Sequence, residues 1–138
     1  MTTPPSPRPV EHSSKNDQGI FRVARADVPA LKAATLELNH AFLPISLSGA
    51  KNVPGFLKAI SRDLAFPEWF GGNLDALYDC LTDLSWIPAS GYVITLDNID
   101  TLQANPTSFA VLNAVLGSVA EEWQARKVPF KIFYLQED

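Results

Sequence analysis

Sulfur and long apolar runs are scarce in this sequence of 138 residues. Cys80 is the only cysteine, which excludes an intramolecular disulfide and a multi-cysteine metal site and is typical of a reducing compartment. No apolar run approaches the roughly 20 residues that span a bilayer, and the N-terminus lacks the apolar centre of a secretory signal. We therefore expect a cytoplasmic protein that binds no metal, no other cofactor and no membrane.

Positive charge is missing from the middle of the chain. No Lys, Arg or His occurs from Asp63 through Ala125, a segment that holds nine of the fifteen acidic residues. Such a segment repels nucleic acid and attracts a basic partner. The alternative is that acids and bases interleave once the chain folds, so the charge pattern alone leaves both interpretations open.

Apolar residues are almost absent from residues 1–18, which contain Pro4, Pro5, Pro7 and Pro9. Ordering this segment would cost backbone entropy without burying apolar surface, so we predict a disordered tail. The whole chain is 46 % hydrophobic, and its length suits one compact domain beyond that tail.

Apolar periodicity divides the rest of the chain into strands and helices. Strands are predicted at 19–23, 42–47, 91–97 and 129–135, and helices at 26–38, 51–66, 73–84 and 106–127. Pro44 cannot donate to a ladder, so it must lie at a strand start or on an edge. Long helical connections between short apolar strands favour an α/β fold with a small parallel sheet.

Polar residues mark where several helices begin. Asn52 precedes a proline in the first turn and is an expected N-cap. Asn73 follows two glycines that permit a sharp turn, and it is the expected cap of the third helix. For the last helix, Thr107 and Ser108 beside Pro106 are the cap candidates.

The helix predicted at 73–84 carries two triplets of side chains at helical spacing. Its leucines share one face and its aspartates share another: Leu77, Leu81 and Leu84, and Asp75, Asp79 and Asp83. The leucine face is expected to point to the core. Each pair of stacked aspartates costs roughly 0.2 to 0.5 kcal/mol, with no Lys or Arg on the helix to offset it. The acidic face is therefore either a merely solvated surface or a surface for a partner.

Two aromatic residues, Trp69 and Phe70, precede this helix on a loop that Gly71 and Gly72 allow to turn sharply. Tyr78 lies at the border between the leucine and aspartate faces. Aromatic side chains beside charges resemble the composition of binding hot spots. The alternative is that Trp69, Phe70 or both simply plug the core.

Catalysis is not indicated. Asp75 and Asp79 share one helix face, without the difference in environment that acid–base work on a glycosidic bond requires. A Mg²⁺ role would call for a phosphate-binding loop, which the sequence lacks. We expect His40 to be structural and Cys80 to be a small buried residue. The chain is therefore not expected to be an enzyme.

The string LAFPEWFGGNLDALYDCLTDL at 64–84 closely resembles the central motif of the barstar family, intracellular inhibitors of barnase-type bacterial ribonucleases. Weaker similarity covers residues 41–136. The resemblance implies a small three-stranded parallel sheet packed with helices at 41–138, with residues 19–40 as an N-terminal extension.

The resemblance also implies a function and a binding surface. The partner would be a basic, extracellular-type ribonuclease bound one to one, and the pair would act as toxin and immunity protein. In the family, the carboxylate matching Asp79 replaces a substrate phosphate in the ribonuclease active site, and the one matching Asp75 meets a further basic group. The implied partner-binding residues are Trp69, Phe70, Asn73, Leu74, Asp75, Tyr78, Asp79 and Glu122, with Glu121 as the alternative to Glu122.

Several positions depart from the family prototype. Trp69 and Phe70 stand in place of two tyrosines, Tyr78 in place of a tryptophan, and Gly72 in place of a charged residue, whereas both aspartates remain. These differences suggest a ribonuclease related to barnase but not identical with it. The alternative is a barstar-fold interaction module with a different basic partner.

Overall fold

A computed structural model describes residues 19–137 of the chain; the tail predicted at 1–18 lies outside these residues. The elements in chain order are β1 (Ile20–Ala24), a 3-10 turn η2 (Arg25–Asp27), α1 (Val28–Glu37), β2 (Ala41–Ser46), α2 (Val53–Leu64), α3 (Leu74–Leu81), β3 (Tyr92–Asp97), α4 (Asp100–Gln103), α5 (Pro106–Ala125) and β4 (Phe130–Gln136). Among them, no helix is both long and apolar enough to cross a bilayer.

The strands form one parallel sheet in the order β1-β4-β3-β2. The α/β class is therefore confirmed, but the expected count of three strands is wrong, because β1 from the N-terminal extension adds a fourth. Ile20 pairs with Ile132 across β1 and β4, and Ile20 and Val23 are both buried. Without β1, the backbone groups of β4 would form an open edge. Pro44 lies on edge strand β2, as its missing N–H group requires.

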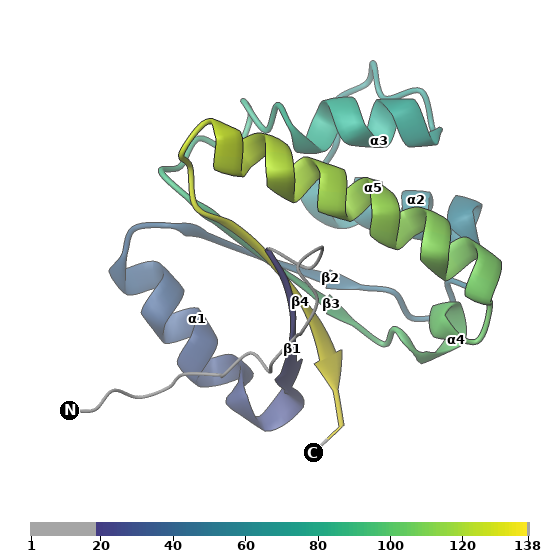
Figure 1. Cartoon of the computed structure of the whole chain (residues 1–138), viewed down its shortest axis with the longest axis horizontal. Helices are drawn as coiled ribbons and strands as arrows, with labels where there is room; N and C mark the ends of the chain where they lie inside the picture. The colour runs from purple at the N-terminus through teal and green to yellow at the C-terminus, as the bar shows by residue number, and fades with distance from the viewer. Residues whose placement is uncertain (1–18, 138) are drawn as a thin grey trace.

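Helices cover the two faces of the sheet unequally (Figure 1). Helices α2, α3 and α5 lie on one side, and α1 lies on the other. The residues Tyr92 through Leu96 of β3 are all buried, as expected for an interior parallel strand with both faces covered. The three-helix side holds the larger core, whereas the α1 side holds a small cluster formed by Val23, Leu31, Val93, Phe133 and Leu135.

The cap of α2 is the predicted one, the α1 cap residue Asp27 makes no side-chain hydrogen bond to its helix, and the cap of α5 differs from the prediction. The Asn52 side chain accepts a hydrogen bond from the Gly55 N–H at 3.0 Å, as expected. In α5, however, the cap is Asn105, whose Oδ1 accepts from the Ser108 N–H at 3.3 Å. The prediction of Thr107 or Ser108 was wrong because Pro106 already occupies the first helical position, so the cap must precede it.

Candidate protein-binding site

The α3 helix begins where the sequence predicts. The Oδ1 atom of Asn73 accepts a hydrogen bond from the Ala76 N–H at 2.8 Å, which confirms Asn73 as the cap. Gly72 has a φ of +74°, a left-handed conformation that glycine adopts without the strain of a side chain. The loop can therefore turn sharply into the helix, and the Asn73 cap satisfies one of its free N–H groups.

The C-terminal end of α3 differs from the prediction, because the helix ends at Leu81 and not near residue 84. Leu84 is fully buried, and it reaches the core with a φ of +46°, outside helical geometry. The Asp83 carboxylate lies beyond the helix and accepts a hydrogen bond from the Ser85 hydroxyl at 3.0 Å. The predicted row of three stacked aspartates is therefore reduced to the pair Asp75 and Asp79.

Two side chains hold this end of α3, one from α5 and one from the residue that caps the C-terminus of α5. The indole Nε1 of Trp123 donates to the Leu81 carbonyl at 2.8 Å, and Nη1 of Arg126 donates to the Thr82 carbonyl at 2.7 Å. These carbonyls belong to the last turn, where a helix lacks its own donors. Sequence reasoning missed both contacts. The one available signal was that Arg126 is the first basic residue after the segment from Asp63 through Ala125, which contains no Lys, Arg or His.

Asp75 and Asp79 project into solvent from this anchored helix. Neither has a cationic partner among residues 19–137, where the ion pairs involve only Arg25, Arg62 and Arg126. Burial, with smaller contributions from the charges of Asp83 and Asp79, raises the pKa of the Cys80 thiol to about 11. Cys80 is thus buried and protonated near neutral pH, and the exposed chemistry of α3 consists of its carboxylates.

The aromatic side chains near α3 separate into exposed and packed groups. Trp69 is 56 % exposed, which makes it available for contact with another molecule. Phe70 is half-buried and packs edge-on against Phe66, with ring centroids 4.8 Å apart. Leu74 and Tyr78 are also half-buried against the main core. Of the two loop aromatics, Phe70 thus joins the core and Trp69 does not.

The predicted glutamate position on α5 is linked to α3 through Arg126. The Nε atom of Arg126 pairs with Glu122 at 2.9 Å, while its Nη1 binds the Thr82 carbonyl. Glu122 is half-buried and Glu121 is exposed. One guanidinium therefore connects Glu122 to the end of α3, whereas no such link joins Glu121 to it within the described chain.

The arrangement suits binding of basic side chains of another protein. Residues 19–137 contain no group of three or more His, Cys, Asp or Glu side chains placed to hold a metal ion. Asp75 and Asp79 face solvent and are spaced one helical turn apart. Such a pair can accept charge-assisted hydrogen bonds from Arg or Lys side chains of another protein.

Comparison with known proteins adds two findings. The family model described as Barstar (barnase inhibitor) matches residues 40–135, which is more than half of the chain. A structure of the ORC2 protein of Aeropyrum pernix, determined as ADPNP–ADP complexes, is similar over 75 % of this chain, with 24 % sequence identity and a TM-score of 0.53. The match spans only 27 % of that protein, and the similarity concerns the fold.

Proposed function

The chain belongs to the barstar family, and we propose that it inhibits a basic, barnase-type ribonuclease by occupying the active site with the carboxylates of α3. Asp79 would replace a substrate phosphate, and Asp75 would pair with a neighbouring basic group. The proposed inhibitor has no chemistry of its own. It would act in the cytoplasm and protect the producing cell from a ribonuclease toxin.

The observation that carries this proposal is that Asp75 and Asp79 are exposed and have no cationic partner within residues 19–137. Both lie on a helix whose two ends are held by hydrogen bonds. A rigid helix loses little conformational entropy on binding, so its charges are preorganised for a partner. These features support the proposed role of the two carboxylates as a phosphate mimic.

The remaining proposed contact residues would extend the surface around this pair. Trp69 offers an exposed aromatic surface at the N-terminal end of α3, while Asn73, Leu74, Tyr78 and Phe70 shape the helix and its loop. Glu122 would extend the acidic surface toward α5, although Arg126 balances part of its charge. The ribonuclease is thus expected to make most of its charged contacts with α3.

We test the proposal by measuring the affinity of the Asp79→Ala variant for a barnase-type ribonuclease by calorimetry. Removing one member of a charge pair buried at an interface costs about 2 to 5 kcal/mol, a range to which the barnase–barstar complex itself contributes. Asp79→Ala should therefore weaken binding by at least about thirtyfold, and the association rate of the parent protein should fall as salt is raised.

Asp83→Ala is the matched control, because it removes the same charge from a position outside α3. It should bind nearly as tightly as the parent protein. Equal affinity of Asp79→Ala and the parent for an inhibited ribonuclease would overturn phosphate mimicry. If the parent inhibits none of several such ribonucleases at micromolar concentration, an interaction module with another basic partner becomes the better explanation.

A further inference from the structure

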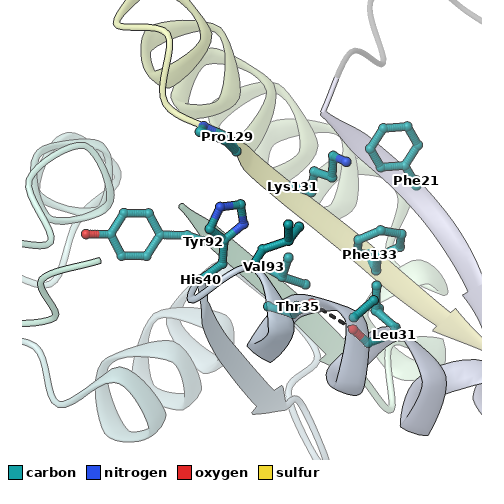
Figure 2. A pocket seen from close by; sticks show the side chains of 11 residues that line it. Phe21, Leu31, Thr35, His40, Tyr92, Val93, Pro129, Lys131 and Phe133 are labelled. Atoms are coloured by element: carbon teal, nitrogen blue, oxygen red, sulfur yellow. Dashed lines mark hydrogen bonds between the residues drawn. The ribbon is translucent and has the colours of Figure 1, made fainter. Parts of the chain in front are cut away.

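A cavity of about 300 Å³ lies on the α1 side of the sheet (Figure 2), opposite the side that carries α3 (Figure 1). Its floor is formed by the sheet residues Phe21, Val93 and Phe133, and α1 contributes Leu31 and Ala34 to its wall. Figure 2 places His40 and Pro129 at one end and Leu31 and Phe133 at the other. Most of this lining is apolar, as in small-molecule sites.

The N-terminal extension creates this cavity. Six of the eleven lining residues come from residues 19–40, a segment that the barstar family model does not match before residue 40. A helix is about 10 Å wide, whereas the outer strands of a four-stranded sheet lie about 15 Å apart. One helix therefore leaves part of the face uncovered, and Leu38 at its end is 63 % exposed beside the opening.

Two nitrogen-bearing side chains stand out in the apolar lining. Lys131 comes from β4, next to Val93 in the sheet register, and forms no ion pair with a carboxylate of residues 19–137. The His40 ring lies against Gly91, where an added Cβ would come within 2.7 Å of three ring atoms. The Thr35 hydroxyl, by contrast, already donates to the Leu31 carbonyl at 2.7 Å.

We propose that this cavity binds a small amphipathic carboxylate, with its apolar body on the sheet and its carboxylate at Lys131. The charge of Lys131 selects an anion, and the His40 ring can supply a second N–H donor in either protonation state. Ligand sites span about 300 to 1,000 Å³, and a volume of about 300 Å³ at the lower end of this range suits a small ligand. The proposal concerns the opposite side of the sheet from α3 and does not depend on ribonuclease inhibition.

The test is calorimetric titration of the full chain with octanoate, compared with octanol of the same chain length. We expect saturable one-to-one binding of octanoate, with a dissociation constant on the order of 0.1 to 1 mM for a ligand of this size. A charge-assisted hydrogen bond should make octanol bind about tenfold more weakly. Lys131→Met keeps an unbranched apolar stem and should abolish the preference for octanoate over octanol.

A pair of α1 variants separates this cavity from nonspecific adsorption. Ala34 lines the cavity and Ala33 does not, yet both are exposed on α1. Ala34→Trp should fill the space and reduce octanoate binding at least tenfold, while Ala33→Trp should leave it unchanged. Circular dichroism checks that both variants are folded.

Three outcomes would overturn the proposal. The first is the absence of saturable octanoate binding up to 10 mM, which is about ten times the weaker of the expected dissociation constants. The second is an equal effect of the two tryptophan variants on octanoate binding. The third is a preference for octanoate over octanol that survives Lys131→Met. Sedimentation of the ligand-free protein tests whether a second copy of the chain covers this face instead. A dimer that Ala34→Trp disrupts and Ala33→Trp does not would assign the face to that second copy and would also overturn the proposal.

Discussion

The two faces of the sheet differ in how completely helices cover them. The face under α2, α3 and α5 is closed by fully buried side chains such as Leu77, Leu81 and Phe56. The face under α1 has a small apolar cluster and an open cavity beside it. The same strands serve both faces, since successive residues point to opposite sides. The face covered by a single helix is therefore less completely packed than the face covered by three.

The largest expected effect comes from the same truncation made on each face. Leu81→Ala removes a fully buried side chain from the closed face and should destabilise the protein by about 2 to 5 kcal/mol. Leu31→Ala, beside the existing cavity, should cost clearly less, because Leu31 has fewer neighbours to lose. Urea denaturation measures both, and equal losses would show that the two faces are equally well packed.

An effect of intermediate size is expected at Asp63, which links α2 to the end of β2 on the closed face. A hydrogen bond from Arg62, helped by one from the Ser46 N–H, lowers the pKa of Asp63, although partial burial opposes this. The contribution of Asp63 to stability is therefore fully present above the unfolded pKa of about 3.9 and is lost as pH falls through the lower folded pKa.

Asp63→Asn should reduce stability by about 1 kcal/mol at neutral pH and should weaken the loss of stability below about pH 4. Denaturation in urea across this pH range tests the prediction. If the parent and Asp63→Asn lose stability in parallel as the solution is acidified, Asp63 does not couple pH to folding.

The smallest expected effect on stability concerns Asp79, on the proposed binding surface. Asp79→Asn relieves the repulsion with Asp75 one turn away, so we expect it to stabilise the free protein by roughly 0.2 to 0.5 kcal/mol. The same variant should weaken ribonuclease binding. Thermal denaturation at low and high salt measures the first effect, which should shrink as salt screens the pair. A destabilised variant would mean that Asp79 supports the fold.

Sequence patterns predicted the helices and strands well where the signal is local. The spacing of Leu77 and Leu81 correctly indicated the buried side of α3. Asn52 and Asn73 cap their helices as expected because a cap acts within three residues. The end of α3 was missed because Leu84 continues the helical pattern, while packing draws it into the core from outside the helix.

The site was less predictable than the elements that hold it. Charge and spacing indicated Asp75 and Asp79, and the resemblance supplied their proposed role. The sequence alone did not reveal that Trp69 is exposed and Phe70 half-buried, since both are large aromatic residues at adjacent positions of one loop. The assignment of contact residues to a partner stays a prediction that the variants above can test.

The sequence by itself determined the family motif, the caps of α2 and α3 and the apolar strands, because each depends on residues a few positions apart. Only the tertiary structure decided that β1 joins β4 as a fourth strand, that Arg126 connects Glu122 to the end of α3, and that α1 leaves a cavity uncovered. These features join residues distant in sequence. Their formation depends on how layers pack against one another, which no local pattern records.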